Sequence, residues 1–149
     1  MEFIASFEPK TPKNATSALC RLLIVEKHDE LRKRLVALVN SQENCQCIGA
    51  VVDAESAIAM MQEAQPDLVL MELAVSGDCG FKLLRRLKLE YPDVRRLIFS
   101  AHWDLSYVKQ AREEGVDGYI FKANPEELIP ALRSVIAGQS FFAAGAAIA

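Results

Sequence analysis

Residues Pro66–Gly80 read PDLVLMELAVSGDCG, and this stretch decides the fold. Its first half contains the unbroken apolar run Leu68–Met71, which predicts a strand buried on both faces, as is typical of parallel sheets in α/β domains. Glu72 ends the run, and a loop with Ser76 and Gly77 leads into a helical pattern. Ligands and chemistry collect at the carboxyl ends of such strands. Glu72 is therefore a candidate functional residue, and the alternative is an ordinary solvated acid.

The same succession of an apolar run and a helical pattern occurs five times along the chain. The predicted strands are Arg21–Val25, Cys47–Val52, Leu68–Met71, Val94–Ser100 and Gly118–Phe121. Connections of this length, each with a helix, require parallel strands with helices on both faces. The sequence thus predicts an α/β fold, a flavodoxin-like (βα)5 doubly wound sheet with strand order 2-1-3-4-5.

Helix boundaries are indicated by residues with known positional preferences. Asp53 is expected to cap the second helix through its side chain, and either His28 or Asp29 to cap the first. Gly115 and Gly138 are expected to end the fourth and fifth helices, because glycine adopts the left-handed conformation common there.

Composition limits the class of protein. The chain has 149 residues, of which 51% are hydrophobic and 25% charged, with a net charge of -3. These values suit one folded domain, which we place at residues 21–138, between a flexible N-terminal tail (1–20) and a C-terminal linker stub or tail (139–149). Nothing indicates nucleic-acid or membrane binding by this domain, and no secretion signal is evident. The four cysteines are expected to be thiols, in keeping with a cytoplasmic location.

Four candidate residues follow predicted strands and should share one edge of the sheet. Glu26 and Lys27 follow the first strand, Glu72 the third, and Lys122 the fifth, while Ser100 ends the fourth. Because strands one and three flank the switch point of this fold, their ends should face one crevice.

Taken together, several motifs resemble the receiver domain of two-component response regulators, most closely the NarL/LuxR type. They are LLIVEKHDELRKRL, PDLVLMEL with GFKLLRRL, LIFSAH, and GVDGYIFKANPEELIPAL, and the resemblance runs from about Arg21 to Phe142. It implies that Glu26 and Lys27 occupy the positions of an acidic pair that binds Mg²⁺, and Glu72 that of the phosphoacceptor aspartate. It also implies phosphate contacts for Ser100 and Lys122, and an aromatic switch whose position here is held by Tyr119.

The sequence departs from the family at two of these positions. Glu72 is one methylene, about 1.5 Å, longer than aspartate, and phosphoryl transfer depends on positioning. Lys27 has only donors and cannot be a ligand of Mg²⁺. Two acids and two lysines make the site neutral, whereas three acids and one lysine would need a divalent cation. We therefore expect the Lys27 ammonium to replace Mg²⁺ and pair with Glu26 or Glu72; alternatively it extends into water.

The leading hypothesis is a pseudo-receiver: a phosphorylation-independent interaction module, not an enzyme, without cofactor or metal. The hypothesis includes that the chain is the N-terminal half of a DNA-binding transcription regulator. It would bind a protein partner or form a homodimer through the fourth helix, fifth strand and fifth helix. The residues of this surface are Tyr107, Lys109, Arg112, Glu113, Tyr119 and Glu127.

Two other functions compete with this hypothesis. The first is a receiver still phosphorylated by a histidine kinase, on Glu72 or on another acid such as Asp78, with weak Mg²⁺ binding. The second is an unrelated enzyme or nucleotide binder, which the absence of a glycine-rich phosphate loop and of a paired nucleophile disfavours.

Overall fold

The computed structural model describes residues 19–74 and 79–143, apart from the side chain of Cys79. The described residues do not include Ser76 and Gly77 of the expected loop, the candidate acceptor Asp78, or most of the two predicted tails. Within the described part, strands and helices alternate as expected. The strands are β1 (Cys20–Val25), β2 (Cys45–Val51), β3 (Leu68–Met71), β4 (Arg95–Ser100), β5 (Gly118–Phe121) and β6 (Phe141–Phe142). The helices are α1 (Asp29–Asn40), α2 (Ala54–Ala64), α3 (Cys79–Glu90), α4 (Leu105–Glu113) and α5 (Leu128–Ile136), the last preceded by a 3-10 turn at Pro125–Glu127.

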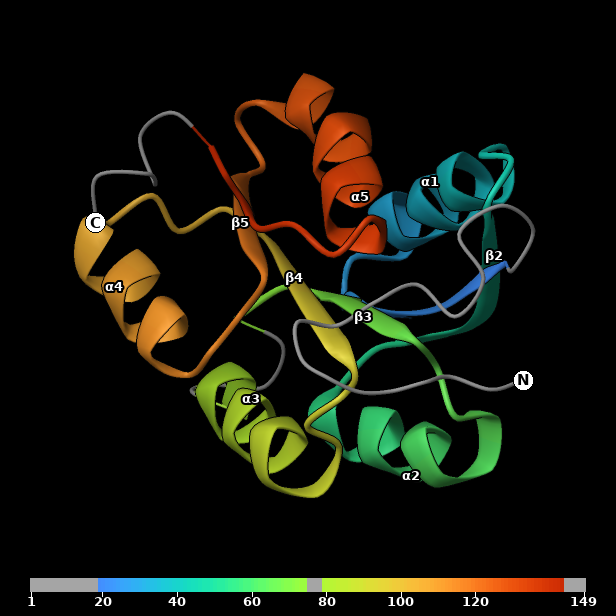
Figure 1. Cartoon of the computed structure of the whole chain (residues 1–149), viewed down its shortest axis with the longest axis horizontal. Coiled ribbons are helices and arrows are strands. Elements are labelled where there is room, and N and C mark those ends of the chain that lie inside the picture. Colours follow the sequence, from blue (N-terminus) through green and yellow to red (C-terminus); the bar gives the residue numbers. More distant parts are fainter. Residues whose placement is uncertain (1–18, 75–78, 144–149) are drawn as a thin grey trace.

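The sheet is parallel and has the order β2-β1-β3-β4-β5-β6. The predicted order 2-1-3-4-5 is confirmed. β6 is an addition within residues that the sequence assigned to a linker stub. Figure 1 shows α1 and α5 over one face of the sheet, α2 and α3 over the other, and α4 beside β5.

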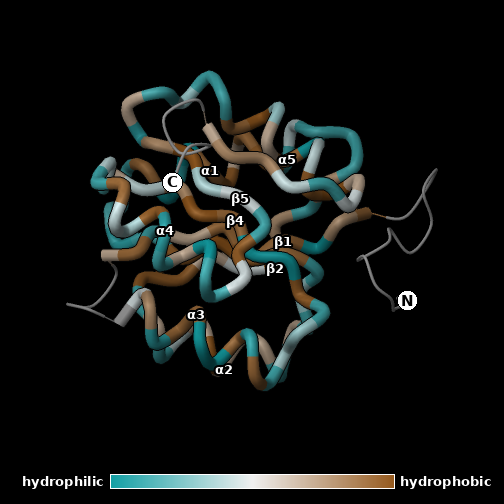
Figure 2. Tube along the Cα trace, turned by 60° about the vertical axis from the view of Figure 1, so that its left-hand side comes forward, coloured by the Kyte–Doolittle hydropathy of each residue, from teal (hydrophilic) through white to brown (hydrophobic). Residues whose placement is uncertain are grey.

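The central strands form the core because most of their side chains are apolar; the buried polar residues Arg95, Arg96 and Ser100 lie at the two ends of β4. Every residue of β3, β4 and β5 is buried, and Figure 2 shows the hydrophobic segments of the chain gathered along the middle of the molecule. Burial of one such large apolar side chain stabilises the fold by about 1.5–3 kcal/mol. None of the helices in the described part of the chain is long and apolar enough to cross a membrane.

The helix ends follow the predicted chemistry with one exception. The Asp53 carboxylate accepts a hydrogen bond from the Ser56 N–H at 2.8 Å. Gly115 and Gly138 have φ angles of 81° and 90°, as expected for left-handed ends. His28 occupies the N-cap of α1, but its side chain makes no capping hydrogen bond. The Asp29 and Glu30 carboxylates in the first turn supply the favourable charge instead.

Candidate functional site

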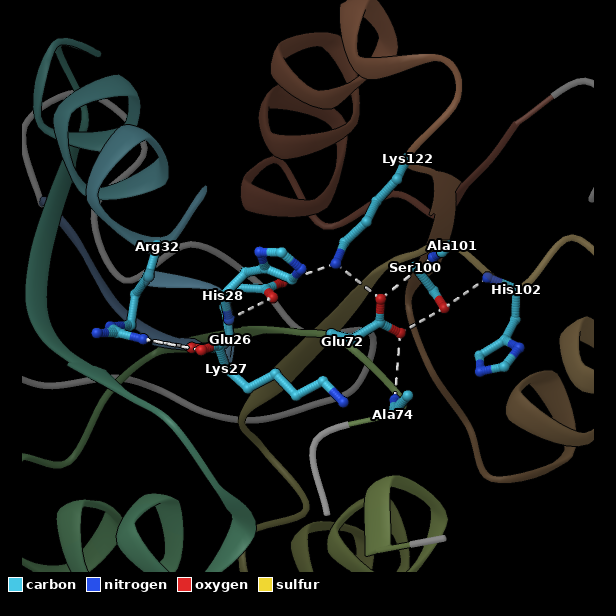
Figure 3. A network of polar contacts seen from close by, with 10 residues as sticks. All are labelled: Glu26, Lys27, His28, Arg32, Glu72, Ala74, Ser100, Ala101, His102 and Lys122. Carbon is cyan, nitrogen blue, oxygen red and sulfur yellow. Dashed lines mark hydrogen bonds and ion pairs between the residues drawn. The ribbon is translucent and has the colours of Figure 1, made fainter. Parts of the chain in front are cut away.

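The carboxyl ends of β1, β3, β4 and β5 bring four predicted residues together. The Lys122 Nζ lies 2.9 Å from Glu26 Oε1 and 2.8 Å from Glu72 Oε1, so one ammonium bridges two carboxylates (Figure 3). Glu26 is 2% exposed and Glu72 is 4% exposed, whereas the Lys122 side chain is 20% exposed. The prediction that these residues share one edge is confirmed.

The Glu72 carboxylate accepts three further hydrogen bonds. Ser100 Oγ donates to Oε2 at 2.5 Å, the Ala101 N–H donates to Oε1 at 3.2 Å, and the Ala74 N–H donates to Oε2 at 3.2 Å. With Lys122, four donors converge on this one side chain. Glu72 is therefore a structural part of the site and not a solvated acid at a strand end.

The local charges keep this pair ionised. Burial raises the pKa of Glu72, but hydrogen bonds from Lys122 and Ser100 outweigh it and hold the pKa below its ordinary value. Burial likewise lowers the pKa of Lys122, and the two carboxylates raise it further than burial lowers it. The two directions agree with each other and favour a charged Glu72–Lys122 pair.

Lys27 does not take part in this triad, so the predicted pairing with Glu26 or Glu72 is wrong. Its side chain is exposed, and Figure 3 shows it extended below Glu72 with no contact to either carboxylate. Because successive side chains at the end of a strand point to opposite sides, Glu26 turns inward and Lys27 outward. Lys122, which follows β5 on the far side of β4 from β3, supplies the cation that the sequence assigned to Lys27.

The backbone at the end of β1 is held by its own contacts. The His28 N–H donates to Glu26 Oε2 at 3.1 Å, and Arg32 Nη1 donates to the Glu26 carbonyl at 2.9 Å. Glu26 is thus fixed by a backbone donor on one oxygen and by Lys122 on the other.

The loop between β4 and α4 connects the site to Tyr119. Ser100 Oγ accepts a hydrogen bond from the His102 N–H at 3.0 Å, and the His102 carbonyl accepts one from the Tyr119 hydroxyl at 2.8 Å. The His102 and Tyr107 rings pack edge to face, with 4.5 Å between their centroids. Tyr119 is fully buried, and burial raises the pKa of its hydroxyl well above the ordinary value.

The buried position of Tyr119 corrects one part of the predicted interaction surface. Tyr119 cannot contact a partner, because it lies on the buried face of β5 beneath α4. Lys109, Arg112 and Glu113 are exposed, while Tyr107 and Glu127 are partly exposed. Binding by this surface stays a prediction.

Sequence reasoning missed three features of the site. The backbone donors Ala74 and Ala101 carry no residue-type signature, because any residue supplies an N–H. Phe142 was missed for another reason: its ring lies 4.0 Å from the Arg112 guanidinium, although it belongs to residues interpreted as a linker. Trp103 lies in the loop after β4 and is 76% exposed.

The donor set differs from what Mg²⁺ needs. Mg²⁺ prefers several carboxylate and water oxygens in octahedral geometry. Both carboxylates here are engaged by Lys122, and the neighbouring side chain of Lys27 offers only donors. Within residues 19–74 and 79–143, no group of three or more His, Cys, Asp or Glu residues is arranged to hold a metal ion.

Comparisons with known proteins agree with this geometry. The family model described as "Response regulator receiver domain" matches residues 22–133. The chain is 32% identical over 121 residues to the transcriptional activator protein ExaE of Pseudomonas putida, covering 80% of this chain and 56% of that protein. It is 27% identical over 124 residues to the response regulator GacA of Pseudomonas aeruginosa, covering 83% and 58%. The chain thus spans just over half the length of these curated relatives.

A solved structure gives the same result in three dimensions. The crystal structure of a LuxR-family two-component response regulator from Aurantimonas sp. SI85-9A1 superposes with a TM-score of 0.82 at 26% identity. The match covers 88% of this chain and 94% of that one. Sequence motifs, strand order and site geometry lead to one conclusion: the chain belongs to the response regulator receiver domain family.

Proposed function

We propose that this chain is a pseudo-receiver, a signalling interaction module whose conformation does not depend on phosphorylation. One observation carries the proposal: Lys122, Ser100 and two backbone N–H groups already bind the Glu72 carboxylate. Ser100 and Lys122 are the residues that the resemblance assigns to phosphate contacts. In this chain their donors are occupied by a permanent anion, so Glu72 takes the place that a phosphoryl group would fill.

The state of Glu72 also makes it a poor nucleophile. Its carboxylate is 4% exposed, and both oxygens accept hydrogen bonds that would have to break before in-line attack on a phosphoryl donor. The same contacts hold its pKa low, which stabilises the anion where it lies. These contacts therefore favour a site in which Glu72 stays bound to its donors over one in which it attacks a phosphoryl donor.

Charge at the mouth of the site supports the same function. One buried ammonium already offsets part of the charge of two buried carboxylates, and Lys27 adds a positive charge beside them. A divalent cation would have to approach between two lysines, which electrostatic repulsion disfavours. Mg²⁺ binding of ordinary receiver strength is not expected.

The proposal also includes the context of the domain. Because the relative ExaE is a transcriptional activator protein about twice the matched length, we infer that this receiver is the N-terminal half of a DNA-binding transcription regulator in the cytoplasm. The module would act by binding a protein partner or a second copy through α4, β5 and α5, and not as an enzyme.

The alternative is a receiver that a histidine kinase still phosphorylates, with Mg²⁺ held weakly. Glu26 favours it, since one acid of the expected pair is present and buried. Asp78, the other acceptor considered, lies outside the described residues.

The deciding experiment is a Mg²⁺ titration, with and without beryllofluoride, followed by Trp103 fluorescence. Trp103 is the only tryptophan and is 76% exposed three residues after Ser100. Acetyl phosphate followed by intact mass measurement tests phosphorylation directly. The pseudo-receiver gives no saturable response and no phosphoryl adduct, whereas both together would establish the alternative.

A designed reversal sharpens the test. The double variant Glu72→Asp with Lys27→Asp restores an acceptor of ordinary length and a second acid next to Glu26, so it should gain a saturable Mg²⁺ response. The matched control combines Glu72→Asp with Lys33→Asp, which makes the same charge change on the exposed side of α1. The control should show no saturable Mg²⁺ response, because it leaves Lys27 beside the site.

A further inference from the structure

The edge of β5 is occupied by the chain's own C-terminal residues. β6 pairs with β5 in parallel, with Phe141 opposite Gly118 and Phe142 opposite Tyr119. The Phe141 N–H donates to the Asp117 carbonyl at 3.0 Å, and the Ala143 N–H donates to the Tyr119 carbonyl at 3.1 Å. Two hydrogen bonds alone hold a two-residue strand only weakly.

Packing at this edge shows that β6 occupies a specific position against β5. A Cβ atom on Gly118 would lie 2.5 Å from the Phe141 carbonyl oxygen, so this close approach requires glycine at position 118. Ala143 is 1% exposed, although it lies beyond the last helix. The three residues Phe141–Ala143, which we name the C-terminal latch, are thus packed into the domain.

Arg112 closes the latch from α4. Its guanidinium lies 4.0 Å from the centroid of the Phe142 ring. Phe142 reaches α4 because it alternates with Phe141, which faces the opposite side of the sheet. A cation–π contact at such a partly exposed position adds stabilisation comparable to one of the two hydrogen bonds. The latch therefore depends on the position of α4 as well as on β5.

A continuous set of contacts joins the latch to Glu72. Glu72 accepts from Ser100, Ser100 accepts from the His102 N–H, and the His102 carbonyl accepts from the Tyr119 hydroxyl. Tyr119 then accepts the Ala143 N–H through its backbone carbonyl. The same residue, Tyr119, thus contacts the loop after β4 with its side chain and the latch with its backbone.

We propose that docking of the C-terminal latch on β5 and α4 is coupled to the contacts of Glu72. When Ser100 holds Glu72 and Tyr119 holds the β4–α4 loop, α4 keeps Arg112 over Phe142 and the latch stays docked. When those contacts break, α4 loses its support and the latch opens. The inference does not require Glu72 to act as a phosphate mimic.

Amide hydrogen exchange by NMR on the full chain tests the coupling. The probes are the Phe141 and Ala143 amides, and the Ile24 amide in central β1 reports global unfolding. Arg112→Gln should speed exchange of the two latch amides about two- to five-fold, which is the worth of an exposed cation–π contact. Lys109→Gln, a neutralisation elsewhere on the exposed side of α4, is the matched control and should leave them unchanged.

The coupling itself is tested by variants that do not touch the latch. Ser100→Ala removes the link to Glu72, and Tyr119→Phe removes only the hydroxyl, so it folds even where the first does not. Each should speed exchange of the Ala143 amide at least about three-fold while the Ile24 amide keeps its rate. Unchanged latch amides in both variants, or equal acceleration of Ile24, would overturn the proposal.

Discussion

Replacing Lys122 by glutamine tests the central ion triad directly. The substitution keeps much of the side-chain length and one donor but removes the positive charge. Glu26 and Glu72, at 2% and 4% exposure, then remain buried without their shared ammonium. No other side-chain cation forms a salt bridge with either carboxylate among the described residues.

The expected loss of stability is large because two buried charges lose one partner. Breaking a buried ion pair by removing one partner costs about 3–5 kcal/mol. A domain of this size is stable by about 5–15 kcal/mol in total. Ser100 and the backbone donors still bind Glu72, so the lower end of the range, about 3 kcal/mol at pH 8, is our expectation.

The pH dependence of this loss gives a sharper test. In the wild type the pKa of Glu72 is lowered from its ordinary value of 4.5, so its contribution is present above that value and is lost as the pH falls below it. In the variant, the lowering effect of Lys122 is lost while burial still raises the pKa of Glu72, so this pKa rises. The variant should therefore gain stability as the pH falls from 8 to 5, by up to about 1.4 kcal/mol per pH unit for each proton taken up on folding.

Urea unfolding followed by circular dichroism at pH 8 and pH 5 measures both effects. The wild type should show little change between these two values, while the deficit of Lys122→Gln shrinks at pH 5. The control is Lys82→Gln, which removes an exposed lysine of α3 and should cost less than about 0.5 kcal/mol at either pH. A deficit below about 1 kcal/mol at pH 8, or one that grows toward pH 5, would refute the triad as the organising feature of the site.

Two further predictions concern positions that hold the site in place. A Cβ at Gly80 would lie 2.0 Å from the backbone oxygen of Leu73, whereas one at Gly49 meets the flexible end of Met60 at 2.4 Å. In urea unfolding, we expect Gly80→Ala to destabilise the chain by at least about 3 kcal/mol and Gly49→Ala by less than about 1.5 kcal/mol. Equal losses of stability in the two variants would contradict the backbone-clash argument. Arg96 donates to two carbonyl groups at the C-terminal end of α4 at 2.8 and 2.7 Å, so Arg96→Met should lower the melting temperature through a loss of about 1–3 kcal/mol and speed hydrogen exchange in α4 more than in α1.

Most of the fold follows from local sequence patterns. Apolar runs such as Leu68–Met71 predicted the central strands, because strands buried on both faces consist mostly of apolar residues. The observed β2 starts at Cys45, two residues earlier than predicted, since the polar Gln46 sits on its exposed side. β6 could not be predicted, because two phenylalanines after a glycine have no period, and their pairing depends on Gly118, which is distant in sequence.

The sequence predicted which residues meet at the site, but not which lysine forms the ion pairs with the two acids. Parallel strand ends placed Glu26, Glu72, Ser100 and Lys122 at one edge, and the structure confirms that they meet. Which cation lies between the two acids could not be decided from sequence, because charge counting treats Lys27 and Lys122 alike. The direction of a side chain at a strand end decides it, and that direction depends on backbone geometry.

The triad also determines where regulation of this chain could act. Moving Glu72 away from its four donors would leave a buried carboxylate without its partners, while Lys122 keeps only Glu26, at a cost of several kcal/mol. A phosphoryl donor or Mg²⁺ could displace Glu72 only if it binds the state with Glu72 displaced more tightly than the resting state. The difference in binding free energy would have to be comparable to this cost. A partner that binds α4 or the C-terminal latch faces no such cost, because the Arg112–Phe142 contact is partly exposed and weak. Input to this domain is therefore expected at its α4 surface, with the Glu72 site serving as the rigid support against which that surface moves.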